Sequence, residues 1–230
     1  MTALICFKHI QHDGYMPNSV TFLAILKACG QIEAGKRGQT THVKILKEGL
    51  LEKDVSLGNA LVDMYAKCGE LGRAQSVFDE LLLRNIVSWT SLIGGYAEYG
   101  YGKEALNCLE SMKYEGFSPD AITFVSLLNA CSHSGMVNEA ETYYGNMSKK
   151  YGIAPNLEHH TSMVIIYCFE GHFDKAMSVM KMMPSCDYSA VWFVLVDSCR
   201  KWGNMKLGSW AFEHSLQVNI DCMQPYVLTT

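Results

Sequence analysis

The chain has 230 residues, of which 49% are hydrophobic and 18% are charged, and its 19 basic and 23 acidic residues give a formal net charge of −4. This composition excludes a wholly disordered chain and a strongly basic nucleic-acid coat. No run approaches the roughly eighteen apolar residues that a membrane span requires, so we predict no membrane association.

Nine cysteines are spread along the chain at wide spacings, and no C-x-x-C pair occurs. This pattern gives little support to a zinc ribbon or a thioredoxin-type redox site. We predict that the cysteines are small buried side chains of a protein in a reducing compartment.

An internal repeat runs through the chain. Five stretches have Gly first and Ala or Gly five residues later, and their glycines are 31, 35, 36 and 32 residues apart. They are GELGRA from Gly69, GYGKEA from Gly100, GMVNEA from Gly135, GHFDKA from Gly171 and GNMKLG from Gly203. Eleven residues before the last four of these glycines stand Trp89, Phe124, His160 and Trp192. Two columns in one register indicate a repeated structural unit.

Each unit is predicted to contain two helices. In residues 86–120, Trp89, Leu92 and Ile93 are spaced three and four residues apart, which is typical of a helix. Gly100 is expected to end that helix in the left-handed conformation, and a second amphipathic helix follows. A lone helical pair cannot bury its apolar face, whereas a stack of pairs can. We therefore predict an all-α fold, an α-solenoid of helix-turn-helix repeats.

The repeat register divides the chain into units of unequal length, unlike the steady period of about 34 residues in tetratricopeptide arrays. The first and last units are incomplete, and we expect both ends of the chain to be truncated. The predicted units are 1–18, 19–54, 55–85, 86–120, 121–156, 157–188, 189–222 and 223–230.

Four stretches carry a more specific resemblance: GNALVDMYAKCGELGRAQSVFDE, RNIVSWTSLIGGYAEYGYGKEAL, GFSPDAITFVSLLNACSHSG and SAVWFVLVDSCRKWGNMKLG. Over essentially its whole length the chain resembles a plant pentatricopeptide repeat protein of the PLS class, E subgroup. The resemblance types the units in order as the end of a P repeat, then L, S, P, L and S repeats, a first E motif and the start of a second. It implies a right-handed superhelix that binds single-stranded RNA, one nucleotide per repeat.

The resemblance also implies a biological role, which is to specify cytidines for C-to-U editing of organelle transcripts. The expected location is the mitochondrion, with the chloroplast as the alternative. A separate editing deaminase is the expected protein partner, docking through residues 189–230, where Trp192, Trp202 and Trp210 are candidate anchors. For Trp192 a place in the core is favoured.

By the same resemblance, the fifth and last residues of each repeat read the RNA base. The pairs are Leu23 with Asp54, Asn59 with Asn85, Thr90 with Asp120, and Val125 with Asn156; Asn18 is the last residue of the incomplete first unit. In 157–188 the fifth residue is Thr161 and the register makes Tyr188 the last, so the adjacent Asp187 is the expected substitute.

The second residue of each repeat is expected to slide between neighbouring base faces, which requires an apolar side chain. Val20, Val87 and Ile122 meet this requirement, whereas Ser56 and Glu158 do not.

Side-chain chemistry supports such base reading. A carboxylate only accepts hydrogen bonds and suits guanine N1–H or uracil N3–H, whereas an amide can also donate to adenine N1 or cytosine N3. Repeat 55–85 is expected to prefer cytosine over uracil, and repeat 86–120 to prefer guanine. The alternative for a polar residue at the start of a helix is N-capping. The repeat register favours RNA contact at Asn59, Asn85, Thr90 and Asp120.

No enzymatic function is predicted. The H-x-E and P-C-x-x-C strings of a zinc deaminase do not occur, and we expect no catalytic site, metal or cofactor. His159 and His160 are interpreted as residues at the start of a helix. Two alternative functions stay open: an organelle RNA stability or splicing factor, and a helical scaffold that binds only proteins.

Overall fold

A computed structural model of the protein describes the backbone of residues 17–183 and 189–227, with side chains described at 17–183 and 191–216. These residues form twelve α-helices and no strand, which confirms the prediction of an all-α solenoid of helical pairs. None of the described helices is both long enough and apolar enough to cross a bilayer. Asp187 and Tyr188 lie outside the described residues.

The helices alternate as the first and second members of six pairs. In chain order they are α2 (Ser19–Gln31), α3 (Gly35–Lys47), α4 (Val55–Lys67), α5 (Leu71–Glu80), α6 (Ile86–Glu98), α7 (Gly102–Tyr114), α8 (Ala121–His133), α9 (Val137–Tyr151), α10 (Leu157–Phe169), α11 (Phe173–Met180), α12 (Ser189–Lys201) and α13 (Met205–Val227). Each even-numbered helix begins at the first residue of a unit expected from the sequence. The assignment of those units to P, L, S and E types stays a prediction.

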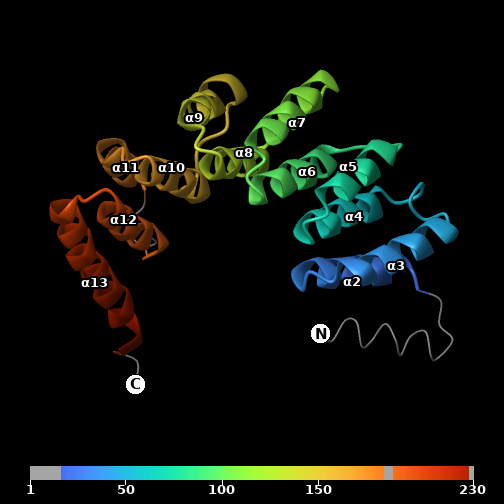
Figure 1. Ribbon diagram of the computed structural model, residues 1–230, viewed down its shortest axis with the longest axis horizontal. Coiled ribbons are helices and arrows are strands. Elements are labelled where there is room, and N and C mark those ends of the chain that lie inside the picture. Colours follow the sequence, from blue (N-terminus) through green and yellow to red (C-terminus); the bar gives the residue numbers. More distant parts are fainter. Residues whose placement is uncertain (1–16, 184–188, 228–230) are drawn as a thin grey trace. The chain divides into compact units, whose positions relative to one another are not determined.

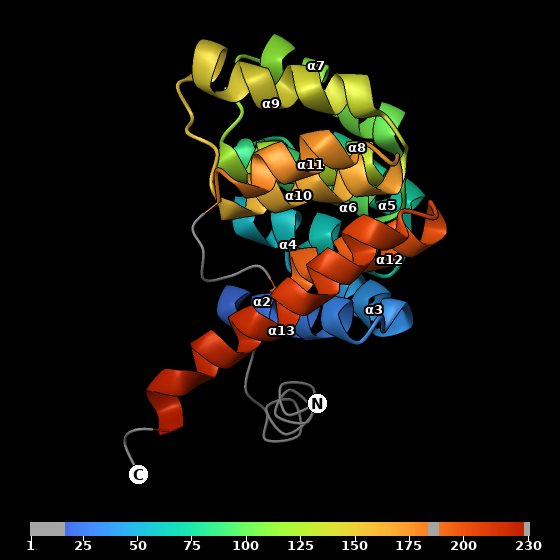
Figure 2. The ribbon, with the colours of Figure 1, turned by 90° about the vertical axis from the view of Figure 1, so that its left-hand side faces the viewer.

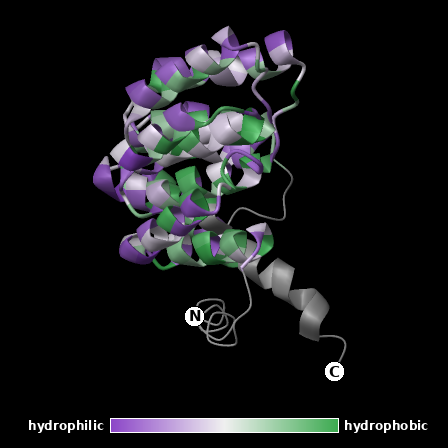
Figure 3. Cartoon of the chain, turned by 90° about the vertical axis from the view of Figure 1, so that its right-hand side faces the viewer, coloured by the Kyte–Doolittle hydropathy of each residue, from purple (hydrophilic) through white to green (hydrophobic). Residues whose placement is uncertain are grey.

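The chain forms two compact units, residues 1–130 and 131–230. In the first unit, α4 packs between α2 and α6, so that the first helices of successive pairs lie side by side (Figure 1). Each second helix packs against the first helix of its own pair. The first helices of this unit carry more hydrophobic residues than the second helices, because they are packed on more sides (Figure 3).

The core of the first unit follows the helical spacing of apolar residues. Phe22, Leu57, Leu61, Leu92 and Ile93 are fully buried. The glycine column holds the turns between paired helices, and Gly69 and Gly100 both have φ +73°. In the first described pair the same column carries Glu33, which adopts a φ of 52° without being glycine.

In the second unit, α10 packs against α9, α11 and α12, and α13 lies along α12 (Figure 2). Trp192 is 6% exposed and packs edge-on against Trp210, with 5.6 Å between ring centroids. This confirms the expectation that Trp192 belongs to the core. Trp202 is half exposed, and its ring packs beside Gly171 while its indole N–H donates to the Phe169 carbonyl.

Candidate nucleic-acid interface

The last residue of each unit from Asn18 to Asn156 caps the first helix of the next unit. A side-chain oxygen of the N-cap residue accepts a hydrogen bond from a backbone N–H in the first turn, which satisfies one of the donors left over at a helix start. The capping residues are Asn18, Asp54, Asn85, Asp120 and Asn156. Capping, the alternative to RNA contact, is therefore a structural role of these residues. It uses one side-chain atom and leaves a second one for another partner.

Asn59 and Asn85, the expected reading pair of repeat 55–85, lie in hydrogen-bonding contact. Asn59 Nδ2 donates to Asn85 Oδ1 at 3.2 Å, and the Ser88 backbone N–H donates to the same oxygen at 3.0 Å. Asn59 is only 8% exposed, whereas Asn85 is partly exposed. Asn85 therefore has its Nδ2 group available for an outside partner. The nearly buried Asn59 mainly helps to fix the orientation of the Asn85 side chain.

Thr90 and Asp120, the expected pair of repeat 86–120, are linked through Thr123. Asp120 Oδ1 accepts from the Thr123 backbone N–H at 2.8 Å and from the Thr123 hydroxyl at 2.7 Å. Thr90 Oγ1 lies 3.3 Å from Thr123 Oγ1 and donates its own hydrogen to the Ile86 carbonyl at 2.7 Å. Asp120 Oδ2 and Thr90 Oγ1 are thereby left as hydrogen-bond acceptors.

A groove of about 380 Å³ joins these residues to the exposed apolar side chains beside them. Val87 on α6 and Ile122 on α8 line it together with Thr90 and Asp120. Its volume falls within the roughly 300–1,000 Å³ of small-molecule sites. The site expected from the sequence for repeat 86–120 is thus assembled in one place, with two polar residues and two apolar ones.

Charge in the groove is mainly acidic. Asp63, Glu98 and Asp120 line it, and Lys67 is the cation among its described lining residues. Lys67 donates to Asp63 at 2.8 Å, and both side chains are about two-fifths exposed. The groove therefore offers a ligand hydrogen-bonding side chains and apolar surface rather than unpaired positive charge.

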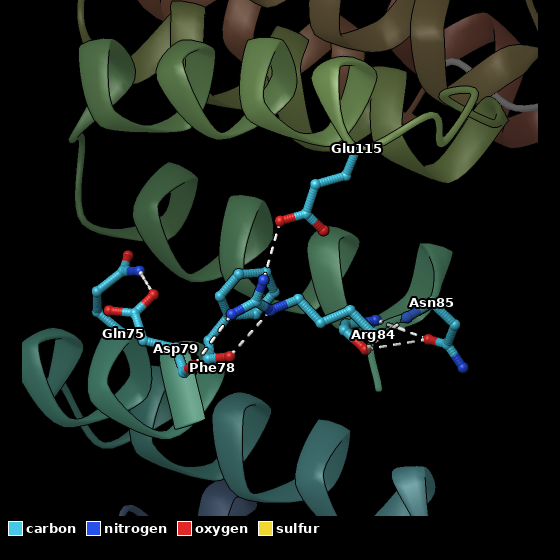
Figure 4. A network of polar contacts seen from close by, with 7 residues as sticks. Gln75, Phe78, Asp79, Arg84, Asn85 and Glu115 are labelled. Atoms are coloured by element: carbon cyan, nitrogen blue, oxygen red, sulfur yellow. Dashed lines mark hydrogen bonds and ion pairs between the residues drawn. The ribbon is translucent and has the colours of Figure 1, made fainter. Parts of the chain in front are cut away.

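The segment that leads into Asn85 is anchored by Arg84 (Figure 4). The Arg84 guanidinium donates to the carbonyls of Phe78 and Asp79 and to Glu115 Oε1, and it lies 4.8 Å from the centre of the Phe78 ring. These contacts tie the start of α6 to the ends of α5 and α7, so the N-cap residue is held on a fixed backbone.

The remaining predicted site residues fall into two groups. Val20 is 72% exposed and Leu23 partly exposed on α2, with Asn18 at its N-cap and Asp54 at the N-cap of α4. Val125, also in the first unit, is partly exposed on α8; in the second unit, Asn156 caps α10 and Thr161 is partly exposed on it.

Sequence reasoning missed three participants: Lys67, Ser88 and Thr123. The last two are the third residues of their repeats and complete the hydrogen bonds of the capping residues. The signal that could have found them is the pattern of Asn or Asp followed three residues later by Ser or Thr, which is a relative of the capping box. Among the described residues, no group of three His, Cys, Asp or Glu side chains could hold a metal ion.

Comparison with known families identifies the repeat. A model described as PPR repeat matches residues 59–86, 122–151 and 158–188, and a model described as PPR repeat family matches residues 84–133. Together these matches cover more than half of the chain. The chain belongs to the pentatricopeptide repeat family.

Several curated relatives from Arabidopsis thaliana resemble the chain. A putative pentatricopeptide repeat-containing protein is 38% identical over 213 residues, covering 92% of this chain and 42% of the relative. A relative named as mitochondrial is 37% identical, and the match covers 98% of this chain and 34% of the relative. The chloroplastic protein CRR2 is 40% identical, with coverages of 83% and 29%. The chain therefore spans less than half of the length of each of these relatives.

Solved structures share the fold. The pentatricopeptide repeat protein PPR10, in complex with an 18-nt psaJ RNA element, matches with a TM-score of 0.74 and 19% identity, covering 94% of this chain and 32% of that one. PPR10 from maize matches with a TM-score of 0.67 and 21% identity, with coverages of 99% and 32%.

Proposed function

We propose that this chain recognises a short single-stranded RNA tract in an organelle, the mitochondrion or the chloroplast, and specifies a cytidine for C-to-U editing by a deaminase supplied in trans. It acts as a binding protein and performs no catalysis itself. The observation that carries the proposal is the groove of repeat 86–120, where Thr90, Asp120, Val87 and Ile122 meet. That PPR10 was solved with RNA supports the same use of this fold.

Guanine fits the groove of repeat 86–120 better than the other bases. Guanine presents two adjacent donors, N1–H and the N2 amino group, and Asp120 Oδ2 and Thr90 Oγ1 are two acceptors. Uracil offers a single N3–H flanked by carbonyl oxygens, which two acceptors would repel. Adenine and cytosine present an acceptor where the carboxylate needs a donor.

Cytosine fits repeat 55–85 because the outward group of Asn85 is a donor. Asn85 Nδ2 can donate to cytosine N3, whereas uracil has an N–H at that position. With the chain running from the RNA 5′ end, as the family resemblance implies, the two repeats read C-G in that order.

Exposed apolar residues at one repeat position support base stacking. Val20, Val87 and Ile122 are 72%, 56% and 64% exposed, although valine and isoleucine are usually buried. Inserting each side chain between two bases would remove that surface from water. It would also provide binding free energy that does not depend on phosphate charge, which suits an acidic groove.

The experiment that tests RNA binding uses the whole chain and labelled RNA. We expect the chain to retard a single-stranded oligomer that contains the C-G step in a gel shift. A scrambled oligomer and the same sequence in a duplex should bind more weakly. Equal retardation of all three would contradict the proposal, and no retardation would favour the scaffold alternative.

The editing role is tested separately, by sequencing mitochondrial and chloroplast transcripts from plants that lack the protein. Loss of C-to-U conversion at defined sites is expected. Unchanged editing combined with altered transcript levels or splicing would favour the stability or splicing alternative.

Exposed Trp202 and Phe212 on the α12–α13 pair support docking of a protein partner there.

A further inference from the structure

In two successive repeats, 86–120 and 121–156, the third residue forms hydrogen bonds with the last residue of the preceding repeat. Ser88 contacts Asn85, and Thr123 contacts Asp120. Both Ser88 and Thr123 are fully buried, so neither can touch RNA directly. In repeat 55–85 the third residue is Leu57, and there Asp54 accepts instead from the Ser56 backbone N–H.

We propose that Ser88 is a positioning residue that decides which atom of Asn85 faces the RNA base, and thereby makes repeat 55–85 select cytosine over uracil. The inference rests on the proposed function, because it concerns base reading in the same groove. It assigns a specificity role to a residue that lies outside the expected reading pair.

Hydrogen bonds around Ser88 connect it to both asparagines. The Asn85 backbone N–H donates to Ser88 Oγ at 3.1 Å, and the Ser88 hydroxyl lies within donating distance of Asn59 Oδ1 at 2.5 Å and of Asn85 Oδ1 at 3.2 Å. Asn59 then turns its Nδ2 toward Asn85 Oδ1 at 3.2 Å. The orientation of an amide is determined by such a network. Ser88 therefore fixes Asn59, and Asn59 fixes Asn85.

The network prevents the Asn85 amide from turning over. In the reversed orientation, Asn85 Nδ2 would face two other donors, the Ser88 backbone N–H and Asn59 Nδ2. Without the Ser88 hydroxyl, Asn59 can turn and present Oδ1 to a reversed Asn85, so that only the backbone N–H of residue 88 still opposes the reversal. Asn85 would then offer its own Oδ1 to the RNA, and uracil N3–H could donate to it.

The neighbouring site provides a matched control because Asp120 is symmetric. Thr123 also donates to its capping residue, but a carboxylate presents an acceptor in either orientation. Removing the Thr123 hydroxyl is therefore expected to weaken binding without changing base preference. The two sites share a hydroxyl at the third position. They differ in whether the capping side chain has two different ends and in the fifth residue, because Asn59 donates to Asn85 whereas Thr90 donates to the Ile86 carbonyl.

The test measures dissociation constants of the full chain, by fluorescence anisotropy, for four RNAs that differ only at the nucleotide facing repeat 55–85. For the parent chain we expect cytosine to be preferred over uracil by roughly tenfold, as for other base-edge contacts. Ser88→Ala should reduce that ratio at least threefold. Ser88→Thr should restore it, since Thr123 provides the same hydroxyl at the equivalent position. Thr123→Val should leave the guanine preference of repeat 86–120 unchanged.

Loss of fold is separated from loss of positioning by a second background. In Asn85→Asp the capping side chain becomes symmetric, so adding Ser88→Ala should no longer alter the base preference, although the same buried hydroxyl is removed. A parent preference that survives Ser88→Ala, with all four RNAs weakened equally, would overturn the inference alone. Equal binding of all four RNAs by the parent chain would overturn the proposed function, and the inference with it.

Discussion

At the scale of single residues, the capping side chains can combine capping with the base reading that we propose, because the two roles use different atoms. Asp120 shows this most clearly, because Oδ1 accepts both hydrogen bonds from Thr123, which leaves Oδ2 for a ligand of the groove that Asp120 lines. Capping therefore does not compete with the proposed base reading. The helix start instead fixes the side chain in an orientation that leaves its second atom available.

Asp120→Asn tests whether capping and base reading use different atoms of this side chain. Asparagine can keep its Oδ1 on Thr123, as Asn85 does on Ser88, and would present Nδ2 where Asp120 presents Oδ2. We expect the preferred base facing repeat 86–120 to change from guanine toward adenine, by roughly 1–3 kcal/mol. Binding to four RNAs that differ at that nucleotide measures it. A purely capping role would change thermal stability slightly and leave the base preference as it was.

Glu33 is a second residue whose conformation leads to a prediction. It occupies the glycine column of the first described pair with a φ of 52°, a region that costs a residue with a side chain about 1–2 kcal/mol. Glu33→Gly should therefore raise the free energy of unfolding by roughly 1 kcal/mol, measured by urea denaturation. Glu33→Ala keeps the strain and should give no comparable gain. Equal stabilisation by both variants would point to removal of the charge as the cause.

At the scale of elements, sequence reasoning succeeded where a local signal determines the structure. Helix starts follow from capping residues such as Asn85, and turns follow from glycines such as Gly100. The burial of Asn59 was not predicted, because it depends on a contact between successive first helices, α4 and α6. The role of Ser88 depends on the direction of one hydroxyl hydrogen, which no spacing in the sequence specifies.

The close packing of α4 and α6 depends on Gly95. A Cβ at this position would lie 2.6 Å from Ala66 Cβ, so the helices would have to move apart. We expect Gly95→Ala to lower the free energy of unfolding by about 1–3 kcal/mol in chemical denaturation. At the adjacent Gly94, an added Cβ meets only Ser126 Oγ at 3.7 Å, an ordinary contact. Gly94→Ala should be neutral or stabilising because alanine favours helix, and similar losses at both positions would contradict this account of the packing.

At the scale of the whole molecule, four of the six cysteines whose side chains are described are buried as the sequence predicted, and two are not fully buried. Cys29, Cys131, Cys168 and Cys199 are fully buried, and Cys68 and Cys108 are partly exposed. Burial raises the pKa of the Cys168 thiol to about 12. These thiols pack as small apolar groups among the helices.

Burial of Cys168 makes stability depend on alkaline pH. The folded thiol, with its raised pKa, keeps its proton above pH 8.5, where the unfolded thiol begins to release it. The stabilisation that the buried neutral thiol gives to the folded state is therefore fully present below about pH 8.5. It is lost as the pH rises toward 12, and the loss of stability reaches roughly 2 kcal/mol by pH 10. Cys168→Ala should be less stable than the parent chain at pH 7.5, and that difference should narrow by pH 10 in urea titrations. A difference that stays constant with pH would contradict the assignment.

We propose that the helix starts of this α-solenoid present the atoms that read RNA bases. The most direct test of this claim is binding of the full chain to sixteen RNAs that carry every combination of the two nucleotides facing repeats 55–85 and 86–120. We predict that the RNA with cytosine followed by guanine binds most tightly. RNAs changed at either nucleotide should be weaker by roughly 1–3 kcal/mol per change. Equal affinities across the sixteen, or a best sequence unrelated to C-G, would contradict it.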